Sequence, residues 1–299
     1  LSVLHPRYEA TQKEIMLPEM VARLLALVKA AAAAGIGLNI DAEESDRLDL
    51  SLAVLGTVLS DSSLQDWDGF GVVVQAYGKR APHVLDWLYT LAGVLNRRIM
   101  VRLVKGAYWD SEIKHAQVLG LRDYPVFTRK AHTDVSYLAC TRQLLEMRDR
   151  IYPQFATHNA HTAAAVLHMA GDDRNHFEFQ RLHGMGEALH EELRTRSGTR
   201  CRIYAPVGAH RDLWAYLVRR LLENGANNSF VHQIVDESIL PEDIARDPIE
   251  VAKEIRFSSN PRIPMPVDIF GDRRNAKGWN LNDSTDLAAI ERARSPFAS

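Results

Sequence analysis

Residues 99–110 read IMVRLVKGAYWD and place two cations in a run that otherwise has the composition of a buried strand. Side chains of a strand alternate between its two faces, so Arg102 shares a face with Met100 and Val104. Burying an unpaired cation costs several kcal/mol. We therefore expect Arg102 to meet an electron-rich partner, which is either a carboxylate of the protein or an anionic ligand.

The residues that follow Lys105 in this run are first small and then aromatic. Gly106 and Ala107 lack bulk, which would let the flat face or the phosphate of a ligand approach the backbone. Tyr108 and Trp109 come next. The spacing predicts that an electron-rich ligand binds where this strand ends.

A pair of neighbouring arginines, Arg219 and Arg220, lies in the helical pattern AYLVRRLLENG. On a helix these side chains point about 100° apart, and Glu223 follows within one turn. They could be solvated surface charges that add a few tenths of a kcal/mol. They could also form a two-pronged clamp for a carboxylate, which planar guanidinium groups suit. Spacing alone favours the surface pair and leaves the clamp open.

Three further polar residues end strand-like segments. Asp41 in NIDAEESDR has the position of an inward carboxylate, whereas the acids after it suit the first turn of a helix. His158 and His161 could in principle bind a metal, but no carboxylate or cysteine spacing completes such a site, so hydrogen bonding by His158 and Asn159 is favoured. Tyr204 in RIYAPVG could pack its ring at the rim or cover a ligand.

Strand-like and helix-like patterns alternate along the chain, which predicts βαβ units and a parallel sheet. Pro18 suits the first turn of a helix. The predicted strands are 1–4, 36–41, 70–77, 98–105, 153–158, 176–182 and 201–206. The predicted helices are 17–34, 45–60, 80–95, 110–119, 133–147, 161–170, 185–194 and 210–224.

Two α/β folds match this alternation: an open doubly wound sheet, and a (β/α)₈ barrel of the TIM type whose first strand would lie before Leu1. No GxGxxG or GxxxxGK[ST] motif follows a strand, which weakens the open nucleotide-binding sheet. Polar residues also recur at the carboxyl ends of the strands, the rim where barrel enzymes work. These residues are Asp41, Gln75, Lys105, His158, Gln180 and Tyr204. We predict a distorted barrel.

Composition excludes several classes of protein. The 299 residues carry a formal net charge of -2, so no basic field indicates nucleic-acid binding. Two cysteines without a CxxC motif argue against a disulfide framework or a zinc cluster. No apolar run reaches the ~18 residues that a membrane helix needs.

The composition and the apolar periodicity of the sequence change after residue 240. Residues 258–268 hold three prolines, and residues 271–283 lack apolar periodicity, which together indicate a linker. Residues 284–296 could form a short amphipathic helix. The predicted domains are a barrel over residues 1–257 and a linker over residues 258–299.

Seven phrases occur in order along the chain: LSVLHPRY, IDAEESDR, RLVKGAYWDSEI, FATHNAHT, FQRLHGMGE, RIYAPVG and YLVRRLLENGANNSFV. Together they resemble the proline dehydrogenase domain of bifunctional bacterial proline-utilisation flavoproteins, from Leu1 to about residue 245. The segment IPMPVDIFGDRRNAKGWNLND resembles that family's connector to an aldehyde dehydrogenase domain.

This resemblance implies a (β/α)₈ barrel that binds FAD non-covalently and oxidises L-proline to Δ1-pyrroline-5-carboxylate, the first step of proline catabolism. Electrons would pass to a membrane quinone. The enzyme would be cytoplasmic and would associate peripherally with the inner membrane during turnover. A pocket lysine and the first barrel strand would lie upstream of Leu1.

The resemblance also implies roles for individual residues. Arg219 and Arg220 would bind the proline carboxylate. Asp41, Tyr204, Leu182 and Tyr108 would shape the substrate pocket. Arg102 would lie near the flavin N5. The other FAD contacts would be Gln75, Val104, Lys105, Gly106, Ala107, Trp109, Thr128, Arg129, Lys130, Thr133, His158, Asn159, Gln180, Glu223, Ser229 and Phe230.

Two alternative functions belong to classes other than flavin-dependent dehydrogenases. One is another barrel enzyme, such as an aldolase that uses Lys105 as a Schiff base. The other is a non-catalytic binding module in which Arg219 and Arg220 are only surface charges. The residue chemistry agrees with the dehydrogenase, because hydride transfer from a secondary amine needs a held carboxylate and a placed C–H bond rather than a strong nucleophile.

Overall fold

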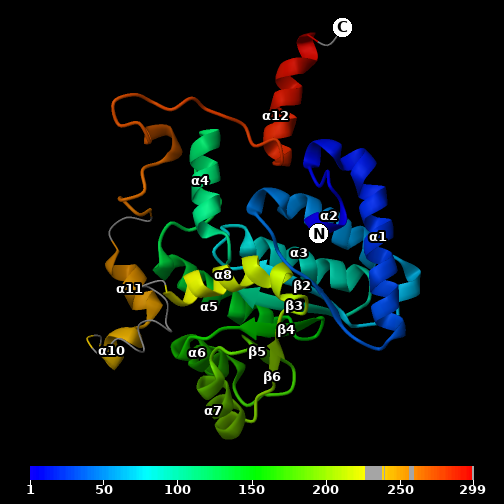
Figure 1. The fold of residues 1–299 in the computed structure, drawn as a ribbon, viewed down its shortest axis with the longest axis vertical. Coiled ribbons are helices and arrows are strands. Elements are labelled where there is room, and N and C mark those ends of the chain that lie inside the picture. The colour runs from blue at the N-terminus through cyan, green and yellow to red at the C-terminus, as the bar shows by residue number, and fades with distance from the viewer. Residues whose placement is uncertain (226–237, 239, 256–258, 298–299) are drawn as a thin grey trace.

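The computed structural model describes residues 1–225, 238, 240–255 and 259–297 (Figure 1). Its sheet has six strands, each paired in parallel with the next along the chain. A doubly wound sheet reverses its strand order, whereas a barrel does not. The order therefore confirms a barrel-type α/β fold. The strands are β1 (Leu38–Ile40), β2 (Phe70–Gln75), β3 (Ile99–Val104), β4 (Ile151–Ala156), β5 (Glu178–Leu182) and β6 (Cys201–Tyr204).

Helices follow each strand and cover the sheet, as Figure 1 shows. Those of the barrel are α1 (Lys13–Ala33), α2 (Leu48–Leu59), α3 (Ala81–Val94), α4 (Trp109–Leu119), α5 (Lys130–Glu146), α6 (Ala160–Ala170), α7 (Glu187–Ser197) and α8 (Trp214–Gly225). Three more follow later among the described residues: α10 (Pro241–Ile244), α11 (Pro248–Glu254) and α12 (Ser284–Arg294).

The two faces of the sheet differ in burial. Alternate residues of β3, Val101 and Leu103, are fully buried in the core that the helices form. Their neighbours Arg102 and Val104 lie on the opposite, inner face and are only half-buried. Because strand side chains alternate, each strand contributes one set of residues to the core and one to the inner face. The inner face is where the predicted site residues of the strands lie.

One predicted strand is wrong. Residues 1–4 form a 3-10 turn, Ser2–Leu4, in which the His5 amide donates to the Ser2 carbonyl at 3.4 Å. The apolar run reflects packing, since Leu1 and Leu4 lie against the core. Such a short run cannot be assigned to a strand by pattern alone.

Pro18 also lies elsewhere than expected. The helix begins at Lys13, so Pro18 is inside α1 and not in its first turn. A proline there removes one hydrogen bond of the helix. The helix continues because Met16, Met20 and Leu24 bury one face against the core.

Residues 259–283, which we name the C-terminal strap, return to the barrel and lie beside α4 (Figure 1). The Tyr124 hydroxyl donates to the Pro264 carbonyl at 2.6 Å, and Ile263 and Met265 pack on the cluster around Tyr124. The predicted terminal helix is present as α12. A continuation of the strap toward another domain stays a prediction.

Among the described residues, no helix combines the length and the apolar character needed to cross a membrane. The same residues hold no group of three or more histidine, cysteine or acidic side chains that could bind a metal ion.

Candidate active site

Arg102, on the inner face of β3, lies at the centre of the rim. Its guanidinium forms an ion pair with Asp41, which follows β1, and lies 5.2 Å from the centre of the Tyr204 ring at the end of β6. The side chain of Arg102 is 13% exposed and that of Asp41 is 76% exposed. Within the described part of the chain, the Arg102 Nε finds no hydrogen-bond partner. The expected carboxylate is therefore present, and one donor of the guanidinium remains for another group.

Gln75, the last residue of β2, joins two loops of the rim. Its Nε2 donates to the Glu43 carbonyl at 2.9 Å, and its Oε1 accepts from the Ala107 amide at 3.1 Å. These bonds tie the loop after β1 to the loop after β3. Gln75 thus has a structural role in addition to the cofactor contact expected from the sequence.

Lys105, after β3, forms an ion pair with Asp134 of α5, which Lys130 also contacts at 2.8 Å. Burial lowers the pKa of Lys105, and the neighbouring Asp134 opposes that shift. Burial alone would raise the pKa of Asp134, but the two lysines outweigh it and hold the pKa low. Two ammonium groups on one carboxylate leave a net positive patch, which suits a phosphate. Sequence reasoning missed Asp134 as a partner.

Gly106 has a conformational reason to be glycine. Its φ is +144°, and a Cβ on it would overlap the ring of Tyr77. An L-residue with a side chain rarely adopts such a φ. The close approach at Gly106 is therefore to a protein ring, and the predicted approach of a ligand stays a prediction.

The aromatic pair after Ala107 lies where α4 begins. Tyr108 is the N-cap residue of α4, and burial followed by the charge of Glu44 raises its pKa. The Trp109 indole donates to the Phe127 carbonyl at 2.8 Å. This bond fixes the Trp109 ring, and the charges of Glu44 and Asp41 that act on Tyr108 place it close to the loop that carries Asp41.

His158, after β4, is held as a neutral acceptor. Its Nε2 accepts from the Leu182 amide at 3.3 Å. Burial, and then the charges of His190, Arg220 and Arg181, lower its pKa to about 4. His158 thus stays uncharged at neutral pH. Asn159 is the N-cap of α6, since its Oδ1 accepts from the Thr162 amide at 2.9 Å.

A buried acid, Glu178, organises the floor of the inner face. It accepts from Gln180 at 2.8 Å and from Gln154 at 2.9 Å, and Arg202 contacts both of its oxygens at 2.7 and 3.0 Å. An ionised carboxylate can only accept, so both amide groups turn their NH₂ toward it. Sequence reasoning found Gln180 and missed Glu178, although period-two counting places both on the same face.

Leu182 and Tyr204 are neighbours in the register of β5 and β6. Leu182 is buried, and burial raises the pKa of the Tyr204 hydroxyl. Their position at the carboxyl end of the sheet brings an apolar side chain and a phenol to the rim beside Arg102.

The two arginines of α8 differ in their surroundings. Arg219 is exposed, whereas Arg220 is half-buried with its guanidinium 5.2 Å from the centre of the Tyr216 ring. The charge of Arg219 acts on Tyr108, and that of Arg220 acts on Tyr204 and His158. α8 therefore lies over the rim, as Figure 1 indicates. The interpretation as purely solvated charges does not suit Arg220.

Of six further residues expected at the cofactor, three have side chains outside the described part of the chain, two contact the strap and one is buried in α5. The side chain of Glu223, and all of Ser229 and Phe230, fall outside the described residues. Thr128 accepts from the Asn260 amide at 2.9 Å, Arg129 donates to the Ser259 carbonyl at 3.0 Å, and Thr133 is buried in α5.

A cavity of about 540 Å³ borders the rim on the side of α2, α4 and the strap. Asp41, Gln75, Glu112 and Trp279 are among the residues that line it. It meets the inner face at Asp41 and Gln75, whereas the floor residues Gln154, Glu178 and Gln180 are not among its walls.

Comparison with known proteins agrees with these features. The family model described as proline dehydrogenase matches residues 2–233. The bifunctional protein PutA of Salmonella typhimurium is 50% identical over 98% of this chain and 23% of its own length. PutA of Rhizobium meliloti is 53% identical over 98% of this chain and 24% of its own. This chain thus spans about a quarter of the length of these relatives.

Two further matches extend the comparison. The proline dehydrogenase of Deinococcus radiodurans is 31% identical over 65% of this chain and 56% of its own length. A crystal structure of Bradyrhizobium japonicum PutA superposes with a TM-score of 0.95 at 51% identity, covering 98% of this chain and 30% of that one. At this identity the likeness concerns side chains as well as the path of the backbone.

Proposed function

This chain belongs to the proline dehydrogenase family, and from that premise we propose that it oxidises L-proline to Δ1-pyrroline-5-carboxylate with FAD as cofactor. The observation that carries the proposal is the meeting of Arg102 and Asp41, 61 residues apart in sequence, beside Tyr204 on one rim. This arrangement occurs in a chain that is 50% identical to a PutA protein.

The residues of the inner face suit FAD. Val104 presents an apolar, half-buried surface, and the Arg102 Nε is a buried donor with no partner in the described part of the chain. Lys105 and Lys130 supply positive charge for phosphates. When bound, FAD would accept the hydride that leaves proline. Arg102 would stabilise the negative charge that develops on the cofactor.

The residues over the rim suit a small amino acid. Arg219 and Arg220 would hold the proline carboxylate, because a pair of guanidinium groups can bind it in a fixed orientation. Asp41, Tyr204, Leu182 and Tyr108 would form the walls of the pocket. The partial burial of Arg220 supports this role, since a contact shielded from water is stronger than one at the surface.

Further parts of the proposal rest on the resemblance to the family. A membrane quinone would accept the electrons, and the enzyme would work in the cytoplasm with peripheral contact to the inner membrane. Residues 1–257 would be the catalytic barrel, and residues 258–299 the connector toward an aldehyde dehydrogenase domain. Reduction of a soluble quinone analogue by the proline-treated protein would test the acceptor.

A visible absorption spectrum recorded before and after addition of L-proline tests the main proposal. We expect a yellow protein whose flavin band bleaches without oxygen, and glycine as the control should leave the band unchanged. A colourless protein, or a band that L-proline does not alter, would reject the proposal. Trapping of a carbonyl substrate on Lys105 by borohydride would favour an aldolase instead.

A further inference from the structure

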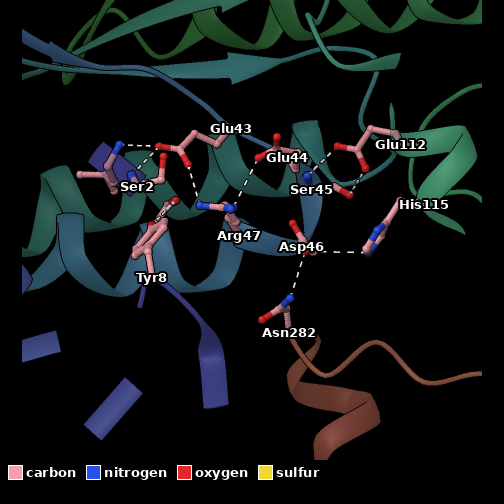
Figure 2. Close-up of polar contacts among 12 residues, drawn as sticks. Ser2, Tyr8, Glu43, Glu44, Ser45, Asp46, Arg47, Glu112, His115 and Asn282 are labelled. Atoms are coloured by element: carbon pink, nitrogen blue, oxygen red, sulfur yellow. Dashed lines mark hydrogen bonds and ion pairs between the residues drawn. The ribbon is translucent and has the colours of Figure 1, made fainter. Parts of the chain in front are cut away.

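Glu112, on the first turns of α4, is a buried acid that the proposed chemistry does not use. Its side chain accepts from the Ser45 amide at 2.6 Å and from the Ser45 hydroxyl at 2.5 Å (Figure 2). It also accepts from the Tyr77 hydroxyl at 3.4 Å. The residue is only 3% exposed. In the described part of the chain, no lysine or arginine forms an ion pair with it. A buried carboxylate without a cation is costly and calls for a reason.

The loop that Glu112 holds is the one that carries Asp41. Residues 41–45 run from the end of β1 to the 3-10 turn Ser45–Arg47 that precedes α2. Gln75 fixes the middle of this loop through the Glu43 carbonyl, and Glu112 fixes its far end through Ser45. Since the Asp41 side chain is 76% exposed, packing does little to orient it. The backbone of the loop must do so.

The groups around Glu112 act on the pKa of its carboxyl group in opposite directions. Burial raises its pKa, the two bonds from Ser45 oppose that shift, and the charges of Asp46 and Glu44 add to it. Tyr77, two residues after β2, donates to Glu112. His115, on the next turn of α4, lies 3.9 Å from Asp46 (Figure 2). The same helix begins with Tyr108 at its N-cap. Glu112 thus links the two loops that carry Asp41 and Tyr108.

We propose that Glu112 is a positioning residue, which holds residues 41–45 so that Asp41 keeps Arg102 in place for substrate binding. That the loop serves substrate binding rests on the proposed function. That Glu112 holds the loop rests on its two contacts with Ser45. Glu112 touches neither substrate nor cofactor in this proposal, and it acts only through the loop.

Kinetics of Glu112→Gln test this role. In this variant the amide oxygen can still accept from the Ser45 N–H, but the NH₂ group beside the Ser45 hydroxyl can only donate, so the bond that the carboxylate accepted there is reversed and weakened. The loop should then hold Asp41 less firmly, and the KM for L-proline should rise about tenfold, with kcat less affected. Asp110→Asn removes a charge from an exposed residue of the same helix and is the matched control. In a protein that already carries Asp41→Asn, the Glu112→Gln change should raise the KM for L-proline by less than about twofold more. The effects of residues that act as a unit are not additive.

A second measurement does not depend on turnover. Hydrogen exchange of the backbone amides of residues 42–47 should be faster in Glu112→Gln and unchanged in Asp110→Asn. Ser45→Ala keeps the backbone bond, so it should fold even if Glu112→Gln does not and should raise exchange by a smaller factor. Equal KM effects with and without Asp41, or unchanged exchange in the loop, would overturn the proposal. If the parent protein fails to oxidise proline, the exchange result still decides whether Glu112 holds the loop.

Discussion

Single side chains of the rim combine a structural and a chemical task. Arg102 is tolerated in an apolar strand because Asp41 and the Tyr204 ring contact its guanidinium from other strands. Gln75 uses both ends of its amide to join two loops. Gly106 lets the chain turn against the Tyr77 ring. The residues expected to act on substrate and cofactor therefore also build the rim.

Replacement of Arg220 by methionine should raise the KM for L-proline by about 10- to 100-fold, because a shielded charge-assisted contact is worth a few kcal/mol. The flavin absorption should persist, since the cofactor contacts on β3 remain. Arg211→Met is the matched control, because that side chain is 88% exposed. Steady-state kinetics with a dye acceptor measure the effect. An unchanged KM would support the interpretation as a surface charge.

The lowered pKa of His158 predicts a loss of stability in acid. The folded protein keeps His158 neutral down to about pH 4, whereas the unfolded chain takes up a proton near pH 6.5. Stability from this residue is therefore complete above pH 6.5 and falls as the pH drops toward 4. Between pH 7 and pH 5 the expected loss is about 2 kcal/mol.

Urea unfolding at both pH values checks this prediction. In His158→Gln the drop between pH 7 and pH 5 should shrink by about 2 kcal/mol, because the side chain no longer titrates. His183→Gln, an exposed histidine nearby, should leave the drop as it is. Equal pH dependence in both variants would contradict the assigned burial of His158.

At the scale of elements, the alternation of patterns predicts six strands and the eight helices of the barrel, because period two and period 3.6 differ clearly over these lengths. It fails for residues 1–4, where four residues are too few to distinguish a turn from a strand. It also cannot show that Asp134 and Glu178 are partners of Lys105 and Gln180, since those pairings depend on how strands and helices are placed in space.

The C-terminal strap approaches α4 so closely that Gly120 has two reasons to be glycine. Its φ is +59° at the C-cap of α4, and a Cβ would overlap the Ala276 carbonyl. Gly120→Ala should cost about 1–2 kcal/mol for the left-handed backbone and about 1–3 kcal/mol more for the displaced strap. Denaturant unfolding measures the free-energy difference.

Gly198 provides the control for that change. It has nearly the same conformation, φ +64° at the C-cap of α7, but a Cβ added there would have no neighbouring atom within 4 Å among the described residues. Gly198→Ala should therefore show the backbone cost alone, and the excess in Gly120→Ala measures the strap contact. Equal costs at both sites would show that the strap does not press on α4.

For the whole molecule, the cavity beside α4 lies next to the inner face, and the loop of residues 41–45 borders both. One side of that loop meets Arg102 and the other meets Glu112. A substitution in α4 can therefore displace Asp41 at the rim through this loop, without any change in the floor residues of the sheet. Composition alone predicts none of this, because the position of the cavity depends on how α2, α4 and the strap enclose the loop.

Binding of FAD should stabilise the folded chain. At a free concentration of about 100 times Kd the gain is about 2.7 kcal/mol, which corresponds to a rise in Tm of roughly 5–10 °C for a protein of this size. Thermal unfolding of the flavin-free protein with increasing FAD measures it, with NAD as the control dinucleotide. A Tm that does not respond to FAD would contradict the proposed cofactor.

The strap also has a consequence for synthesis on the ribosome. Its Asn282 contacts Asp46, 236 residues earlier, so this contact can form only after the barrel has been synthesised. At about 5–20 residues per second, the strap takes roughly 1–5 seconds to be synthesised. During that interval the cluster of Tyr77, Ile113 and Tyr124 lacks its cover of Ile263 and Met265. The nascent barrel therefore exposes this apolar cluster, which a chaperone can recognise, until the strap has emerged and packed on it.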